Sequence, residues 1–289
     1  MSLPSVSEPS AVSLPSDPED HAEEHPGEDH VSLPSASEDT SAMEVDKINL
    51  SLPCAIASGP LARRATGEDD IVEVYSPPRV VPVANSLGLK GDRSLDLKTG
   101  VDFMLEQDRD LSIRLLQIHK VHFLMLSPPC TSFSPIHKLF NKKVMMSETG
   151  KKKWDKAMIM LKHSMDCARV QVMNKRLFVF EHPWRATSWT QNCVMDIMGL
   201  PGVHKVVFDQ CCFGAVTKIT KTPVRKRTQL MTNSSAVVAL FDKQFCKRDH
   251  QHTHLEGVEG GERRTKHAEV YPPELCQALA QCALKECTR

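Results

Sequence analysis

The sequence lacks a long apolar run: no stretch of it approaches the roughly 18 residues that a membrane-spanning helix needs. We therefore expect no integral membrane protein. It also lacks the basic start and apolar stretch of a secretory signal, so we expect an intracellular protein, nuclear or cytoplasmic. We also expect a monomer. Its ten cysteines among 289 residues are too sparse for a disulfide scaffold, which indicates reduced thiols.

Aromatic residues are absent from the first 70 positions, where Ser, Pro, Glu and Asp dominate. This segment holds 15 acidic and three basic residues, a net charge of −12. Its few apolar side chains cannot offset the entropy lost on ordering, so residues 1–70 are predicted to be a disordered acidic tail. A Ser-Leu-Pro-Ser unit recurs in it at irregular spacing, which favours a low-complexity linker over a docking motif.

The remaining 219 residues carry the opposite charge, with 33 basic and 21 acidic side chains and a net charge of +12. A basic body behind an acidic tail indicates a partner that is a polyanion. Nucleic acid is the expected partner, because clustered Lys and Arg side chains neutralise phosphates. DNA is favoured over RNA, and no membrane is expected.

Short apolar segments alternate with amphipathic ones through residues 71–289, which predicts a single α/β domain with a mostly parallel sheet. Ligands bind such sheets beyond the carboxyl ends of the strands. The predicted strands are residues 71–75, 93–97, 121–126, 178–180, 206–208 and 228–232, and the predicted helices are residues 80–87, 108–120, 152–174 and 272–284.

Cys130 follows the strand at 121–126 through Ser127-Pro128-Pro129. Two prolines stiffen this turn and hold the next side chain at the carboxyl edge of the sheet. A thiol nucleophile needs such fixed placement. The alternative is a structural cysteine that caps the strand.

Two further groups lie at strand boundaries. The strand at 178–180 leads into Glu181, whose carboxylate is suited to bind a ring nitrogen or, alternatively, to cap the following helix. Arg225 and Arg227 precede the strand at 228–232, where guanidinium groups are suited to hold a carbonyl or an anion. The alternative for this basic run is a solvated turn.

In this order the motifs resemble those of the cytosine-5 DNA methyltransferases. Ser127-Pro128-Pro129-Cys130 is similar to their Pro-Pro-Cys motif, Phe180-Glu181-His182-Pro183 to their Glu-Asn-Val motif, and Val224-Arg225-Lys226-Arg227 to the second half of their Gln-x-Arg-x-Arg motif. The resemblance covers residues 71–285 and implies a Rossmann-like sheet of the S-adenosylmethionine-dependent methyltransferase type. A narrower resemblance, on Tyr75-Ser76-Pro77-Pro78-Arg79 and a late Cys/His cluster, is to the methyltransferase-like segments associated with copia-type retroelement polyproteins.

The resemblance implies methyl transfer to C5 of cytosine in DNA. Cys130 would attack C6 as a thiolate, Glu181 would bind the N3 and amine edge, and Arg227 with Arg225 would hold the base carbonyl. The base must leave the stack for this chemistry.

The resemblance also implies a binding site for S-adenosylmethionine, made by Tyr75, Ser76, Asp96, Asp102 and Pro128. Asp96 lies where the family binds the ribose, and Asp102 where it contacts the adenine. The family's Phe-x-Gly-x-Gly turn is replaced here by Val74-Tyr75-Ser76-Pro77-Pro78, without glycine. The alternative is therefore a catalytically silent nucleic-acid-binding relative of retroelement origin.

A late cluster, Cys246-x-x-x-His250-x-His252-x-His254, has spacing suited to a metal. Thiolate and imidazole are preferred ligands of zinc. We expect Cys246, His250 and His252 as ligands of a structural zinc ion, with Cys211 or Cys212 as the fourth. The alternatives are a solvated His-rich loop within residues 246–254, or a histidine that contacts nucleic-acid phosphate. With zinc bound, a third interpretation of the whole protein is a zinc-stabilised interaction module of retroelement origin.

Overall fold

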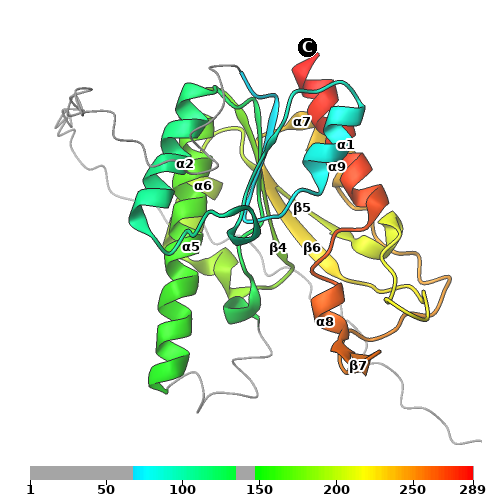
Figure 1. Ribbon diagram of the computed structural model, residues 1–289. Coiled ribbons are helices and arrows are strands. Elements are labelled where there is room, and N and C mark those ends of the chain that lie inside the picture. Colours follow the sequence, from blue (N-terminus) through cyan, green and yellow to red (C-terminus); the bar gives the residue numbers. More distant parts are fainter. Residues whose placement is uncertain (1–67, 135–146, 289) are drawn as a thin grey trace, which may run out of the picture. The chain divides into compact units, whose positions relative to one another are not determined.

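A six-stranded sheet with the strand order β2-β1-β3-β4-β6-β5 forms the centre of the computed structural model (Figure 1). Strands β1, β2, β3 and β4 run parallel to one another, whereas β6 is antiparallel to both β4 and β5. The prediction of a mostly parallel α/β sheet is therefore confirmed. The strands are β1 (Ile71–Val74), β2 (Arg93–Leu95), β3 (Phe123–Leu126), β4 (Leu177–Pro183), β5 (His204–Asp209) and β6 (Arg227–Thr232).

The structure describes residues 68–134 and 147–288. Residues 1–67 of the predicted acidic tail lie outside these ranges. Asp69 and Asp70, which the sequence places in the tail, belong to the folded part: the Asp69 carbonyl accepts from His122 N at 3.0 Å, and the Asp70 carbonyl accepts from Phe123 N at 2.8 Å. None of the described helices is long and apolar enough to cross a membrane.

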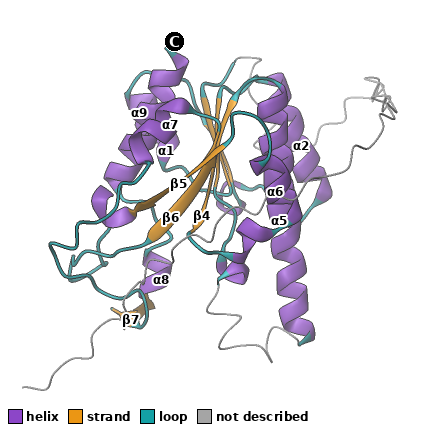
Figure 2. Ribbon diagram, turned by 180° about the vertical axis from the view of Figure 1, so that it is seen from behind, coloured by secondary structure: helices purple, strands orange, loops and turns teal. Residues whose placement is uncertain are grey.

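Helices cover both faces of the sheet (Figures 1 and 2). Helices α2 (Glu106–Ile118), α5 (Glu148–Met173) and α6 (Asn192–Met198) pack on one face, and α1 (Val80–Ser86), α7 (Ser235–Phe241) and α9 (Pro273–Cys287) pack on the other. Because side chains alternate along a strand, Leu124 and Leu126 of β3 join the first core while Phe123 and Met125 join the second. A strand buried on both faces is apolar throughout, as β3 is.

All six predicted strands and four predicted helices occur, with shifted ends. Strand β2 ends at Leu95 because Asp96 caps a short 3-10 turn, Leu97–Thr99. Helix α5 begins at Glu148, where the Ser147 hydroxyl accepts from Gly150 N at 3.1 Å. Helices α6 and α7 were not predicted, because seven residues carry too little periodicity. The sequence also did not predict the β7 (Val258–Glu259) and β8 (Glu262–Arg263) hairpin or α8 (Arg264–His267).

A buried carboxylate closes the start of α1. Glu73 is 1% exposed, and its Oε2 accepts from the backbone nitrogens of Arg79, Val80 and Val81 at 2.9, 3.0 and 2.9 Å. These groups have no partner within the helix, and their partial positive charge favours an anion. Glu73 therefore ties strand β1 to the helix that follows it.

The turn after β1 keeps a conformation that usually requires glycine. Tyr75 has a φ of 64°, in the left-handed region that residues with a side chain rarely adopt. Its N–H donates to the Leu95 carbonyl of β2 at 2.9 Å. The backbone path of a tight strand-to-helix turn thus persists without glycine.

We predict that Glu73→Ala destabilises the protein by about 2–3 kcal/mol, because it leaves backbone N–H groups buried without an acceptor. Glu73→Gln keeps one acceptor oxygen and should cost less. Urea unfolding followed by circular dichroism measures both. Glu68→Ala, an exposed partner of Lys120, is the matched control and should change the free energy of unfolding by less than about 0.5 kcal/mol. A Glu73→Ala protein as stable as wild type would contradict the proposed role of this carboxylate.

Candidate functional site

Cys130, Glu181 and Lys226 meet at the carboxyl edge of the sheet. Cys130 follows β3, Glu181 lies in β4, and Lys226 immediately precedes β6. The Lys226 Nζ lies 3.9 Å from Glu181 Oε1. Burial, together with the negative charge of Glu181, raises the pKa of the Cys130 thiol to about 11, and the positive charge of Lys226 partly offsets this. The structure thus brings the predicted residues Cys130 and Glu181 into one electrostatic environment.

Glu181 retains an unused acceptor in this environment. The residue is 8% exposed, and its Oε1 has no hydrogen-bond partner within the described part of the chain. A buried acceptor without a donor costs roughly 1–3 kcal/mol. A ligand that brings an N–H group to this oxygen would recover that free energy. The site is therefore suited to bind a hydrogen-bond donor next to a thiol.

His182 holds the Cys130 loop against β4. Its Nε2 lies 3.1 Å from the Pro128 carbonyl oxygen, and its Nδ1 lies 2.6 Å from the Ser188 hydroxyl. Burial lowers the pKa of His182 to about 4, so the ring is neutral at pH 7. Because a carbonyl only accepts, Nε2 carries the proton and Nδ1 accepts from Ser188. The predicted residue Pro128 is itself buried and contributes this carbonyl.

The two predicted arginines do not form the ion pair with Glu181. Arg227 instead makes a bidentate pair with the buried Asp209, with Nε–Oδ1 and Nη2–Oδ2 distances of 2.9 and 3.1 Å, and lies over the Trp184 ring. Arg225 is exposed. The Lys226 N–H donates to the Val224 carbonyl at 3.0 Å in a tight turn around Arg225, and the Lys226 side chain reaches Glu181 and the Ala268 carbonyl. The sequence analysis missed Lys226, although its position between two arginines was the available signal.

The predicted cofactor residues lie around the turns that follow β1 and β2. The Tyr75 ring points into the core, where it packs on Phe103 with ring centroids 4.4 Å apart and its hydroxyl bonds His163 Nδ1 at 2.8 Å. The buried Ser76 hydroxyl donates to the Pro77 carbonyl at 2.8 Å.

Asp96 and Asp102 are half-buried, and each accepts one local backbone N–H at 2.9 Å. Both carboxylates follow β2, at the edge where parallel sheets bind ligands.

One segment, between α8 and α9, crosses this edge of the sheet (Figure 1). The Ala268 carbonyl accepts from Lys226 Nζ at 3.1 Å, and the Glu269 carbonyl accepts from Arg79 Nη1 at 2.5 Å. The buried Tyr271 hydroxyl lies 2.8 Å from the Ser127 hydroxyl. The segment therefore contacts the turns after β1 and β3 and the start of β6.

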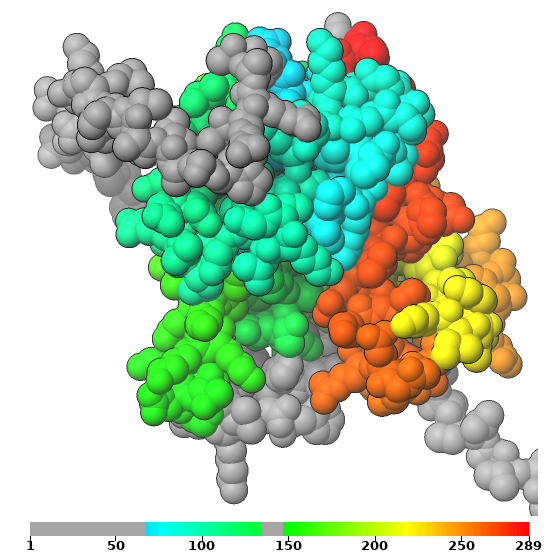
Figure 3. Space-filling model, in the orientation of Figure 1, coloured from blue at the N-terminus to red at the C-terminus, as the bar shows by residue number. Residues whose placement is uncertain are grey.

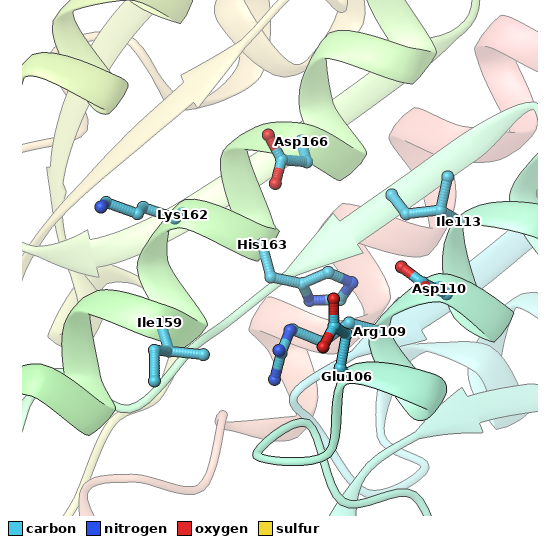
Figure 4. A pocket seen from close by; sticks show the side chains of 8 residues that line it. All are labelled: Glu106, Arg109, Asp110, Ile113, Ile159, Lys162, His163 and Asp166. Atoms are coloured by element: carbon cyan, nitrogen blue, oxygen red, sulfur yellow. The ribbon is translucent and has the colours of Figure 1, made fainter.

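A separate cavity of about 280 Å³ lies between α2 and α5. Figure 4 shows its lining, which contains three acidic side chains, Glu106, Asp110 and Asp166, and two basic ones, Arg109 and Lys162. His163 lies at its base with both ring nitrogens bonded, to Tyr75 and to the Ser112 hydroxyl at 2.8 Å each. Burial lowers the pKa of His163 to about 4, so it is a neutral packing group. Among the residues that the structure describes, no thiol or hydroxyl side chain lines this cavity, and the sheet edge remains the better candidate site.

The predicted metal ligands are brought together. Cys246, His250 and His252 lie with Cys211, and their ligand atoms are all within 4.8 Å of one another. Cys211 belongs to the 3-10 turn Gln210–Phe213 that follows β5. The group does not include Cys212, so the geometry selects one of the two predicted candidates for the fourth ligand.

The described residues form a Rossmann-like, mostly parallel sheet with helices on both faces and with β6 inserted antiparallel between β4 and β5. No protein-family model matches the chain, and no curated protein matches it. Among solved structures the chain is similar to the methyltransferase EhMeth of Entamoeba histolytica, with 10% sequence identity and a TM-score of 0.32. The match covers 68% of this chain and 58% of that chain, so this chain spans less than two thirds of its length.

We predict that the charges beside Cys130 control its reactivity in opposite directions. Glu181→Gln removes a negative charge, lowers the thiol pKa and should accelerate alkylation at pH 8 by about 3- to 10-fold, since one pKa unit changes the thiolate fraction tenfold. Lys226→Met should raise the pKa and slow alkylation. Iodoacetamide labelling with mass spectrometry of the Cys130 peptide measures the rate.

The exposed Cys212, quantified in the same samples, is the internal control and should not respond to either substitution. Equal Cys130 rates in wild type and both variants would show that Glu181 and Lys226 do not act on the thiol.

Proposed function

We propose that this protein transfers a methyl group from S-adenosylmethionine to C5 of cytosine in DNA, with Cys130 as the nucleophile. The observation that carries the proposal is the pairing, at one sheet edge, of the Cys130 thiol with the unused Glu181 acceptor. A base extruded from the duplex would present its amine edge and its C6 atom to such a pair. The basic body supplies the attraction to phosphates.

Cys130 supplies the covalent step. Its thiolate would form a bond to C6, and the electron pair of the C5–C6 double bond would move to C5, which takes the methyl group as the methyl–sulfonium bond breaks and S-adenosylhomocysteine leaves. Loss of the C5 proton to a base and cleavage of the sulfur–carbon bond then restore the double bond and the thiolate. The His182 bond to the Pro128 carbonyl fixes the loop during these steps.

Glu181 and Lys226 divide the recognition of the base. The free Glu181 Oε1 accepts from the exocyclic amine, and Lys226 takes the role of a cation near the base carbonyl. Arg227, held by Asp209, acts by positioning the start of β6. This assignment moves the carbonyl-binding role from the two arginines to the residue between them.

S-Adenosylmethionine supplies the methyl group and carries a ribose and an adenine. Asp96 and Asp102 fit these two parts, because their half-exposed carboxylates follow β2 at the carboxyl edge of the sheet. Tyr75 contributes its left-handed backbone rather than its buried ring.

A second candidate is a catalytically silent nucleic-acid-binding protein with the same fold. Glu73 favours it, because this carboxylate fills the start of α1, a position that binds the anionic part of nucleotide-like ligands in many Rossmann-like sheets. The thiol pKa of about 11 favours it too, since little thiolate forms at pH 7. The basic body would still bind DNA.

The two candidates differ in their binding of S-adenosylmethionine. If the protein is a methyltransferase, calorimetric titration of the full chain with S-adenosylmethionine should give saturable micromolar binding. Asp96→Ala should then weaken the affinity at least roughly tenfold, the loss expected for a charged hydrogen bond to a ribose. Glu148→Ala, an exposed acid at the start of α5, is the control and should bind as wild type. A folded wild-type protein that does not bind would exclude the first candidate, and the second would then require DNA binding by the same protein.

Methyl transfer to DNA tests the nucleophile itself. Cys130→Ser should lower the rate by roughly a thousandfold or more, because the hydroxyl is a far poorer nucleophile, and should leave DNA affinity unchanged. Cys212→Ser is the matched control. Transfer at the wild-type rate by Cys130→Ser, followed with a radiolabelled methyl donor, would remove Cys130 from the mechanism.

A further inference from the structure

We propose that Cys211, Cys246, His250 and His252 bind one zinc ion that fastens residues 244–254 to the end of β5. The site goes beyond the methyl-transfer proposal and does not depend on it. It rests on the arrangement of four ligand atoms, on the hydrogen bonds that orient them and on the absence of helix and strand in this segment.

The ligands come from two parts of the chain. Cys211 is held by the 3-10 turn after β5, whereas the other three belong to a segment without helix or strand. All four ligand atoms lie within 4.8 Å of one another. Two sulfurs and two imidazole nitrogens form a donor set that zinc prefers over magnesium or calcium.

The separations match tetrahedral coordination. Zinc–sulfur and zinc–nitrogen bonds of ordinary length, at a tetrahedral angle, place a sulfur and a nitrogen about 3.6 Å apart. Cys246 Sγ lies 3.6 Å from His250 Nε2 and 3.4 Å from His252 Nε2. Both rings therefore present the same type of nitrogen to the same sulfur at the spacing that a shared ion imposes.

The hydrogen bonds around the cluster orient its groups for coordination. The Asp249 carboxylate accepts from His250 Nδ1 at 2.8 Å, and the other ring nitrogen, Nε2, lies toward Cys246 Sγ. Cys246 Sγ also accepts from Arg248 N at 3.3 Å. A cation at this position would bind both sulfurs and both imidazole nitrogens at once. A carboxylate behind a ligating histidine is a usual support of zinc sites.

The ion would supply a cross-link that this segment otherwise lacks. Its described backbone contacts with the rest of the fold are few. Asp209 N donates to the Gln244 carbonyl at 3.0 Å, Cys246 N to Asp209 Oδ2 at 3.1 Å, Thr253 N to the Pro223 carbonyl at 2.9 Å, and Arg264 Nη1 to the His254 carbonyl at 3.4 Å. Because the segment has no helix or strand, the free energy of metal binding would contribute directly to its ordering.

The cross-link also reaches the neighbouring elements. Asp209 binds both Cys246 N and the Arg227 guanidinium, so the metal segment and the start of β6 share one carboxylate. Beyond the segment, the β7–β8 hairpin packs on the turn at residues 217–222, where Glu259 accepts from Lys218 N and Thr220 N at 3.0 Å each (Figure 3, orange and yellow). Metal binding should therefore stabilise this whole corner of the fold.

The test is metal content of the purified full chain, measured by elemental analysis. Wild type should hold one zinc per chain, and Cys211→Ser and His252→Ala should hold close to none. Cys212→Ser is the matched control, since it changes the adjacent cysteine outside the cluster, and should keep one zinc. Asp249→Asn should keep zinc but bind it about 10- to 100-fold more weakly in competition with a chelator.

Cobalt provides a readout that does not depend on how well the variants fold. Wild type stripped of metal and titrated with cobalt should develop the intense visible bands of a tetrahedral thiolate site, saturating at one equivalent. A wild-type protein that holds no zinc and shows no such bands would overturn the proposal. Equal zinc loss in Cys211→Ser and Cys212→Ser would overturn the assignment of the fourth ligand.

Discussion

The bond between His182 and the Pro128 carbonyl is the constraint on which the candidate site depends. It joins the loop after β3 to strand β4, and it is buried among Phe133, Phe180 and Trp189. Adjacent residues of a strand face opposite sides, so His182 faces α5 and α6 while Glu181 faces the other layer of helices. In β4, His182 thus fixes the Cys130 loop, and the preceding residue, Glu181, supplies the hydrogen-bond acceptor beside it.

The sequence could predict those parts of the site that follow strand ends. Cys130 and Glu181 each come directly after or within an apolar run, and parallel strands bring such positions to one edge. Lys226 could not be separated from its arginine neighbours, because the direction of each side chain depends on where β6 begins. The sequence could not decide whether Cys211 or Cys212 is the fourth metal ligand, because the conformation of a 3-10 turn determines which of them lies near His250 and His252.

Other features escaped the sequence because they depend on tertiary contacts. Glu73 interrupts an apolar strand and carries no local signal of its role, which is to accept three N–H groups from the helix that follows. Asp69 has the composition of the acidic tail, but it is buried beside Arg93 and His119. Composition alone therefore places Asp69 in the tail, whereas its contacts with Arg93 and His122 place it in the fold.

The electrostatics of the sheet edge connect the thiol to any ligand that binds there. Burial and Glu181 keep Cys130 protonated at pH 7, and Lys226 compensates only in part at 3.9 Å from the carboxylate. A ligand that donates a hydrogen bond to Glu181 spreads its negative charge, and a cationic ligand at the same edge favours the thiolate directly. Substrate and a positively charged methyl donor would each lower the thiol pKa, so that Cys130 becomes reactive only in the assembled complex. If the protein binds no methyl donor, the same groups leave the thiol protonated and unreactive. Whether this fold acts as an enzyme therefore depends on which ligands bind at the carboxyl edge of the sheet, beside Cys130 and Glu181.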